Sequence, residues 1–394
     1  MNVLDPLFFI FLIIIGFNIK NLYPNFNSYE RKILNYLFVF HVFISFAFYY
    51  TVSESGGDAI KYWYDIKTIS FDELKILINE DFDPTFFIYL LNYIPSNVLD
   101  LSFYIGNLMY GVMGYWGFVI FLQILKYKIP HYQNLRNIRV FSIRIFPLLL
   151  FMPNLHFWSS GIGKDTIMFF TITLFIYALV KKKHRVFNLI FAIVFIFLTR
   201  QHILLFLVAG FGVGYILSSR IALYKKVFLG IIALIILIPL LSSVLEFAKI
   251  DNLNSNDIEE FSTTKADNLS EESGSGIDIS SYPFPLKVLT FLYRPLFFDA
   301  SSVLSLIVSL ENAFYLILTL SLFKKGFFNR IRHADFFIKG NFYFFLISAC
   351  AFSLILGNLG IIIRQKTMVL VSFLLIVLYI NSIYYLKNIS NRKI

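Results

Sequence analysis

The residues that could do chemistry lie in short polar segments between long apolar stretches. The first segment begins Ser-Gly-Gly-Asp and continues from Asp58 to Tyr62, Trp63 and Tyr64. A carboxylate beside aromatic rings is typical of a sugar site, because rings stack on the apolar faces of pyranoses and the acid accepts hydroxyl protons. A Gly-Asp turn followed by an interfacial aromatic belt has the same pattern. Both interpretations stay open.

The second segment, residues 153–165, reads Pro-Asn-Leu-His-Phe-Trp-Ser-Ser-Gly-Ile-Gly-Lys-Asp. Its proline and two glycines predict a break between helices, so Lys164 and Asp165 would open the next helix at its outer end. The free N–H groups of a helix N-terminus attract anions, and the charge of Lys164 strengthens this attraction. Asp165 could instead be a helix-terminal charge or cap. Trp158 is a candidate substrate contact in the same segment.

Three arginines stand apart in the next polar segments, because each falls in a predicted external loop. They are Arg200, followed two residues later by His202, then Arg294, and then Arg364, followed by Lys366. Basic residues are disfavoured on that side of a membrane protein. The planar guanidinium fork suits phosphate. These residues predict a pyrophosphate cradle, unless each arginine reaches separately to lipid headgroups.

Glu311 is predicted half-way along an apolar segment, with Asn312 beside it. A glutamate in lipid needs a partner, so a structural pair with a neighbouring helix fits as well as catalysis. The six histidines are scattered without metal-ligand spacing, and no nucleotide-binding glycine loop occurs. We therefore expect neither a metal nor a cofactor.

The apolar stretches that must position these residues indicate a membrane protein. Of the 394 residues, 58% are hydrophobic and only 15% are charged, whereas soluble domains have about 25% charged residues. Unbroken apolar runs near the ~20 residues of a spanning helix predict an all-α, polytopic bundle of about eleven spans, between ten and twelve. We predict one integral membrane domain over residues 1–394. The predicted spans are 5–18, 33–51, 99–125, 140–155, 165–180, 186–199, 203–218, 227–246, 301–323, 341–360 and 366–386. The apolar segment 84–94 is too short to span.

The distribution of charge predicts the orientation of the bundle. The net charge is +10, and an orientation with the N-terminus outside and the C-terminus in the cytoplasm places 23 of the 34 Lys and Arg residues inside. This distribution follows the positive-inside rule and contact with anionic lipid, and it argues against a nucleic-acid partner. The segment 249–284 carries eight acidic residues among Ser, Asn and Gly. It is predicted to be a flexible external loop.

The order of the motifs resembles a known family. Gly-Asp with aromatics, Trp-Ser-Ser-Gly-Ile-Gly-Lys-Asp, an arginine between two helices, Arg-Pro with Glu311 downstream, and Asn-Leu-Gly ahead of Arg364 occur in this order. The chain is similar in this respect to Wzy-like O-antigen and capsule polymerases and to EpsG-like proteins. The resemblance implies a multi-pass enzyme of the bacterial inner membrane that acts at the periplasmic face. Its donor and acceptor would be undecaprenyl-pyrophosphate-linked glycans, and a chain-length regulator would be a partner.

The hypothesis is therefore a membrane glycosyltransferase that polymerises lipid-linked repeat units. Asp58 or Asp165 would accept the acceptor proton, and the three arginines would hold the pyrophosphate. The further candidates for substrate binding are Lys164, Tyr62, Trp63, Trp158, His202, Glu311 and Lys366. The alternatives are a GT-C type transferase that uses a polyprenyl-phosphate sugar, an O-antigen ligase, and, from another class, a flippase or transporter. A non-catalytic assembly partner would leave the outward arginines unexplained.

Overall fold

The computed structural model describes residues 3–80, 84–181, 184–218, 224, 226–227, 230–231, 282–355 and 358–391. The chain divides into two compact units. Unit 1 comprises Met1–Tyr127 and Pro147–Arg200, and unit 2 comprises Lys128–Phe146 and Gln201–Ile394. Each unit is described by itself. The predicted span 227–246 and the acidic loop 249–284 lie almost entirely outside the described residues.

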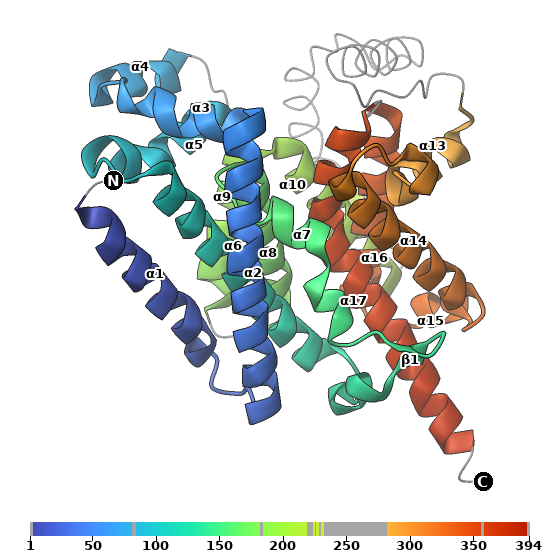
Figure 1. Ribbon diagram of the computed structural model, residues 1–394. Helices are drawn as coiled ribbons and strands as arrows, with labels where there is room; N and C mark the ends of the chain where they lie inside the picture. Colours follow the sequence, from blue (N-terminus) through green and yellow to red (C-terminus); the bar gives the residue numbers. More distant parts are fainter. Residues whose placement is uncertain are drawn as a thin grey trace. The chain divides into compact units, whose positions relative to one another are not determined.

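Unit 1 consists of helices joined by short turns (Figure 1). Its α-helices are α1 (Leu4–Ile19), α2 (Ser28–Ser55), α3 (Asp58–Tyr64), α4 (Phe71–Glu80), α5 (Pro84–Asn92), α6 (Phe103–Lys128), α7 (Pro153–Trp158), α8 (Lys164–Val180) and α9 (Arg185–Thr199). Local sequence fixes several of these ends. A capping box starts α2, where Asn27 Oδ1 accepts from the Glu30 N–H at 2.9 Å and Glu30 Oε2 accepts from the Asn27 N–H at 2.7 Å. The helix α6 buries most of its length in this unit.

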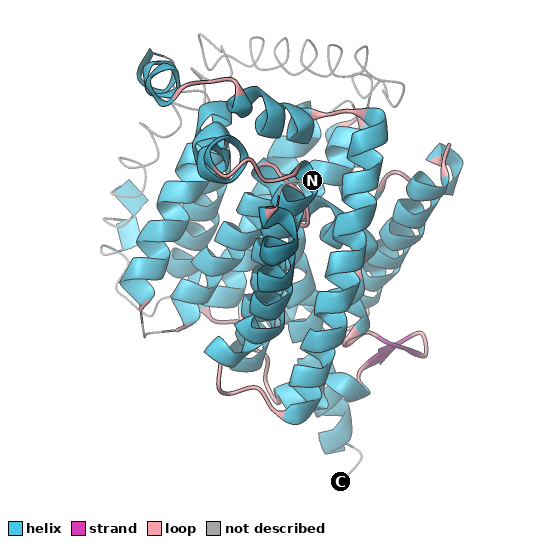
Figure 2. Cartoon of the chain, turned by 60° about the vertical axis from the view of Figure 1, so that its left-hand side comes forward, coloured by secondary structure: helices cyan, strands magenta, loops and turns pink. Residues whose placement is uncertain are grey.

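Unit 2 is also helical, with one short β-hairpin (Figure 2). Its described α-helices are α10 (Gln201–Ser218), α13 (Phe284–Tyr293), α14 (Val303–Phe323), α15 (Phe327–Arg332), α16 (Phe336–Ile355) and α17 (Leu359–Asn391). The hairpin pairs β1 (Arg139–Val140) with β2 (Ile143–Arg144) in antiparallel register. The helix α10 packs closely against α16, which in turn packs against α17.

Seven helices of the described part are long and apolar enough to cross a bilayer. They are α2, α6, α10, α14, α16, α17, and α1 together with the turn that follows it. The prediction of a mostly helical protein with several membrane-spanning helices is thereby supported, whereas the count of about eleven spans and the orientation stay predictions. The predicted spans at 165–180 and 186–199 correspond to α8 and α9. These helices have 17 and 15 residues, fewer than the ~20 residues of a typical spanning helix.

The predicted span at 140–155 is wrong as a continuous helix. The segment instead holds the end of β1, the strand β2, a 3₁₀ turn at Leu148–Phe151 and the beginning of α7. Pro147 and Pro153 explain the break, because proline lacks the N–H that a continuous helix needs and is tolerated at a helix start. Hydropathy alone favours a helix here, since the segment is strongly apolar.

The boundary before α17 also differs from the prediction. Residues 364–366 were expected to cap one helix and precede the next, yet they lie inside α17, which begins at Leu359. Asn358 marks the start, because its side-chain oxygen accepts from the Ile361 N–H at 3.1 Å. Arg364 and Lys366 therefore occupy the second turn of a long helix rather than a flexible connection.

Candidate functional site

A fixed turn precedes α8 and positions the charged residues that open this helix. Ser45 donates to the carbonyl of Ser160 at 2.8 Å, and the Ile162 N–H donates to Asn107 Oδ1 at 3.1 Å. Thr166 donates to the carbonyl of Gly161 at 2.6 Å. Side chains from α2, α6 and α8 thus satisfy backbone groups of a buried segment, as buried polar groups require. The Ser-Ser-Gly-Ile-Gly sequence builds this turn.

A glycine in α6 permits the turn to approach the helix. A Cβ built on Gly114 would lie 1.7 Å from the carbonyl oxygen of Ser159. Backbone atoms cannot move aside as the end of a flexible side chain can, so position 114 accepts only glycine in this packing. The position of the residues that follow the turn depends on this contact.

Asp165 and Arg200 form an ion pair within unit 1. Arg200 Nη2 lies 2.9 Å from Asp165 Oδ1, and the two side chains are 11% and 6% exposed. Asp165 is in the first turn of α8, where the helix dipole favours negative charge, and Arg200 directly follows α9. Removing one member of such a pair leaves an uncompensated buried charge, so the pair ties the start of α8 to the end of α9.

Lys164 extends this pair into a larger group of polar residues. Its ammonium donates to Thr85 Oγ1 at 3.2 Å, and it lies 5.9 Å from the centre of the Tyr62 ring. We call Tyr62, Thr85, Lys164, Asp165 and Arg200 the Lys164 cluster. It places a half-buried ammonium beside the N-terminus of α8, an arrangement that attracts an oxyanion.

Asp58 lies in the same short helix as Tyr62 of this cluster. It is exposed at the first position of α3, and Gly57 before it has a φ of 135°, which favours glycine. Residues four apart share a helix face, so Asp58 and Tyr62 face the same way along α3. The structure therefore brings together four predicted site residues from three segments, namely Tyr62, Lys164, Asp165 and Arg200.

The two tryptophans predicted to contact sugar are placed differently. Trp63 is fully buried, donates to the Leu101 carbonyl at 3.3 Å and fills the space beside Gly106. No face of this ring is exposed in the structure, so a sugar could stack on it only after a rearrangement. Trp158 is half-buried and lies edge-on to Phe48, with ring centres 6.3 Å apart.

Arg294 and Asp299 form a second ion pair, in unit 2. Arg294 Nε lies 3.0 Å from Asp299 Oδ2, and Arg294 Nη2 lies 2.5 Å from Asp299 Oδ1. The Leu296 N–H also donates to Asp299 Oδ2, at 2.8 Å. Burial pushes the pKa of Asp299 upward, but the hydrogen bonds from Arg294 and Leu296 outweigh it and leave this pKa below its ordinary value. The bond to Asp299 raises the pKa of Arg294.

Lys366 joins this pair to two helices. Its ammonium donates to the Arg294 carbonyl at 3.1 Å and to Asn312 Oδ1 at 2.8 Å. Asn312 in turn donates to the Pro295 carbonyl at 2.9 Å. Lys366 is 2% exposed, and besides these two neutral acceptors the carboxylate of Glu311 acts electrostatically on its ammonium. We call Arg294, Asp299, Asn312 and Lys366 the Lys366 cluster.

The other predicted site residues of unit 2 are Glu311, Arg364 and His202. Glu311 is buried in α14 and accepts from the Tyr315 hydroxyl at 2.6 Å, one turn along the same helix. Arg364 is half-buried in α17, two residues before Lys366. His202 lies elsewhere, in α10, with its ring edge-on to that of Phe352.

Several partners were missed from the sequence. Thr85 and Asp299 carry ordinary polar side chains in segments without a motif, and only the fold shows what they contact. His41 and His156 were read as scattered, yet their Nδ1 atoms lie 2.7 Å apart, fully buried in unit 1. His156 Nε2 bonds the Leu150 carbonyl at 2.7 Å. In the described residues no third His, Cys, Asp or Glu joins them as a metal ligand.

These features define a helical membrane protein with two internal clusters of charged residues. No known protein-family model matches the chain, and neither do the curated proteins or the solved structures.

Proposed function

We propose that this protein is a bacterial inner-membrane glycosyltransferase that polymerises polyprenyl-pyrophosphate-linked oligosaccharide units at the outer face. In this proposal the N-terminus is outside and the C-terminus is in the cytoplasm. The Lys164 cluster is the observation that supports it. The ammonium of Lys164 at the start of α8 lies beside the buried ring of Tyr62, and Asp58, one helical turn before Tyr62 in α3, carries an exposed carboxylate. An anionic leaving group requires a positive charge of this kind, and an acceptor hydroxyl requires a base.

The proposal gives the residues of the Lys164 cluster separate roles. Lys164 and the N-terminus of α8 would hold the pyrophosphate and stabilise the charge that grows on it as it leaves. Asp58 would accept the proton of the acceptor hydroxyl, because it is exposed whereas Asp165 is buried against Arg200. Arg294 and Arg364 would serve the pyrophosphate of a lipid-linked unit. The pyrophosphate is already a good leaving group, so the transfer needs no nucleotide.

The test is a polymerisation assay with the purified full-length protein in nanodiscs and an undecaprenyl-pyrophosphate-linked oligosaccharide. We expect Lys164→Ala to lower the rate by about 100-fold, as the loss of one charge-stabilising group does. Lys75→Ala is the matched control, since Lys75 is exposed on α4, and it should retain the wild-type rate. Equal rates for both variants, in protein that remains monodisperse, would remove Lys164 from the reaction.

The products of the same assay distinguish the related enzymes. A polymerase gives a ladder of lengths, a GT-C type transferase adds one sugar, and a ligase moves the whole glycan to another acceptor. The orientation has its own test, because a cysteine introduced between residues 249 and 284 in a Cys350→Ser background should react with an impermeant thiol reagent in spheroplasts. Labelling only after the membrane is opened would reverse the orientation and exclude an outer-face site.

A transporter or flippase is the second candidate, because one observation favours it. Lys366 and Glu311 are both buried, and each lies in a helix apolar enough to span a bilayer. Intramembrane charges of this kind mark ion and substrate pathways. The candidate requires that proteoliposomes containing the protein move a lipid-linked glycan between leaflets, and that Lys366→Met abolish this movement. Movement at the rate of empty liposomes would exclude it.

A further inference from the structure

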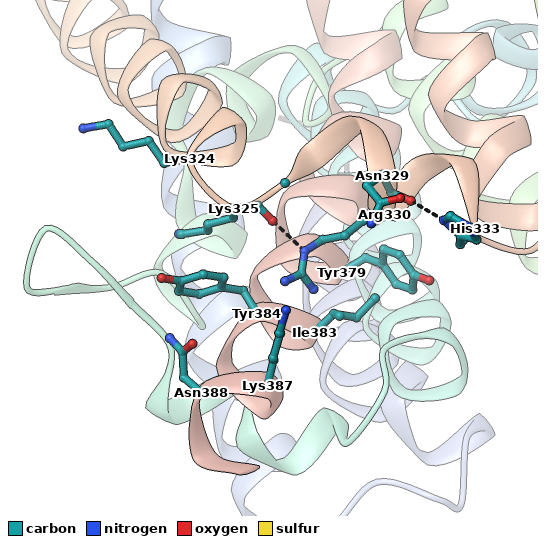
Figure 3. Close-up of a pocket in the computed structure, with 11 residues that line it drawn as sticks. Lys324, Lys325, Asn329, Arg330, His333, Tyr379, Ile383, Tyr384, Lys387 and Asn388 are labelled. Carbon is teal, nitrogen blue, oxygen red and sulfur yellow. Dashed lines mark hydrogen bonds between the residues drawn. The ribbon is translucent and has the colours of Figure 1, made fainter. Parts of the chain in front are cut away.

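A basic cavity lies at one end of unit 2 (Figure 3). It has a volume of about 580 Å³ and is lined where α14 ends, along α15 and along the last turns of α17. The lining includes Lys324, Lys325, Arg330 and Lys387. Pockets of a few hundred Å³ accommodate small ligands and headgroups.

Neutral atoms hold the cations of this cavity. Lys325 donates to Asn381 Oδ1 at 2.5 Å, and Arg330 Nε donates to the carbonyl of Lys325 at 2.6 Å. No Asp or Glu occurs among the described residues of the lining. The nearby carboxylate of Asp335 pairs instead with Lys128, at 3.0 Å. The positive charge of the cavity is therefore not cancelled by the residues that build it.

Tyr384 holds two of these cations together. The Lys325 ammonium lies 5.5 Å, and the Arg330 guanidinium 5.8 Å, from the centre of its ring. Figure 3 shows the ammonium of Lys387 pointing toward the Arg330 guanidinium, whereas Lys324 points away from the cavity. Three cations thus share one space, and the fourth, at the rim, turns its ammonium away from them.

The electrostatics of Lys325 and Arg330 agree with a site for an anion. Burial lowers the pKa of Lys325, and the charge of Arg330 lowers it further. Burial likewise lowers the pKa of Arg330. A bound anion would stabilise both charged forms and offset these effects.

We propose that this cavity binds an anionic phosphate group, held by the guanidinium fork of Arg330 and the ammoniums of Lys325 and Lys387. Arginine binds phosphate through paired N–H donors, and lysine adds a point charge. Some lysines at helix ends serve as orientation signals and nothing more. Side chains with that role alone have no reason to converge on one cavity, as these do. Lys325 follows the apolar span of α14 by two residues, and Lys387 lies in the last turns of the α17 span. The group could come from a phospholipid headgroup or from a free phosphate compound.

Native mass spectrometry of the full-length protein in neutral detergent tests this site. The probes are dioctanoyl phosphatidylglycerol, dioctanoyl phosphatidylcholine and inorganic pyrophosphate. We expect Arg330→Gln and Lys387→Ala each to weaken binding of the anionic probe about tenfold, as the loss of a charge-assisted hydrogen bond does. Arg332→Gln is the matched control, because Arg332 is exposed on the same short helix as Arg330 and does not line the cavity, and it should bind like the wild type.

The probes also identify the source of the phosphate. Binding of phosphatidylglycerol in preference to both other probes supports a lipid headgroup, and binding of pyrophosphate alone supports a free phosphate compound. Equal binding of the two lipids without pyrophosphate binding overturns the proposal. The same holds if Lys387→Ala, a change at an exposed side chain, binds the anionic probe as Arg332→Gln does. This site and the glycosyl transfer proposed above use different residues, so each can fail alone.

Discussion

The Lys164 cluster of unit 1 and the Lys366 cluster of unit 2 hold their ion pairs in different ways. Asp165 and Arg200 are 35 residues apart in the sequence and meet through one contact of 2.9 Å. Arg294 and Asp299 are five residues apart and meet through two contacts, with a backbone N–H added. The first pair needs the packing of α8 against α9, whereas the second forms within one loop. The geometry of the first cluster thus depends on the fold of its whole unit.

The lysines of the two clusters differ in accessibility. Lys164 is half-buried at a helix start, with a hydroxyl and an aromatic ring as neighbours. Lys366 is enclosed within α17, and its donors are used by a carbonyl and an amide oxygen. A ligand can reach the half-buried ammonium of Lys164. To reach the ammonium of Lys366, it would have to break the bonds that this ammonium makes within the protein. This contrast agrees with the proposed ligand contact at Lys164 and with a structural or charge-carrying role for Lys366.

Asp165→Asn should have the largest effect on stability. It leaves the buried guanidinium of Arg200 without its carboxylate, at a cost of about 3–5 kcal/mol. Denaturant titration in detergent measures this, and tryptophan fluorescence reports on unit 1, because Trp63, Trp116 and Trp158 all lie there.

Two further variants make that result specific. The double variant Asp165→Asn with Arg200→Gln should recover much of the lost stability, because no buried charge remains. Asp100→Asn removes the carboxylate of an exposed pair with Lys67 in the same unit and should change little. If the double variant is as unstable as the single one, charge is not what holds α8 to α9.

Gly114→Ala should have the next largest effect, about 3 kcal/mol, because the added methyl group meets the Ser159 carbonyl. Denaturant titration followed by circular dichroism measures it, because this signal reports on the helices of both units. Gly212→Ala in α10 is the matched control, since nothing lies within 4 Å of the added Cβ and alanine favours a helix. Similar stability of the two variants would show that the turn before α8 does not depend on close approach to α6.

The sequence predicts the membrane class and most helices because both follow from hydropathy and helix-end signals. It also singles out Asp165 and Arg200, one by its motif and the other by its departure from the positive-inside rule. Their pairing could not be read, because it depends on how α8 and α9 pack. The same limit applies to Trp63, whose burial depends on Gly106, 43 positions further along the chain. The breaks at Pro147 and Asn358 had local signals that hydropathy outweighed.

Asp299→Asn should lower stability by about 1–2 kcal/mol, less than Asp165→Asn, because hydrogen bonds to a charged group contribute about this much. The pKa of Asp299 is lowered in the fold, so its contribution is present above the unfolded value of about 3.9 and is lost as pH falls through the folded value. Thermal unfolding followed by circular dichroism at pH 3–6 measures the difference from wild type, which should shrink toward the acid end.

Asp335→Asn is the control for this profile, because the pair of Asp335 with Lys128 is more exposed, at 52% and 21% for the two side chains. It should give a smaller change across the same pH range. An unfolding temperature of Asp299→Asn equal to that of the wild type at every pH would show that the local pair adds no stability.

Asp58→Asn should have the smallest effect on stability, within about 0.5 kcal/mol, because the side chain is exposed at the start of α3. The polymerisation rate should nevertheless fall by about 100-fold or more, since a general base contributes at least this much. Measured together, the rate and the fluorescence titration separate chemistry from folding at one residue. A variant with full rate would make the Lys164 cluster a binding site whose reaction, if any, takes its base from elsewhere.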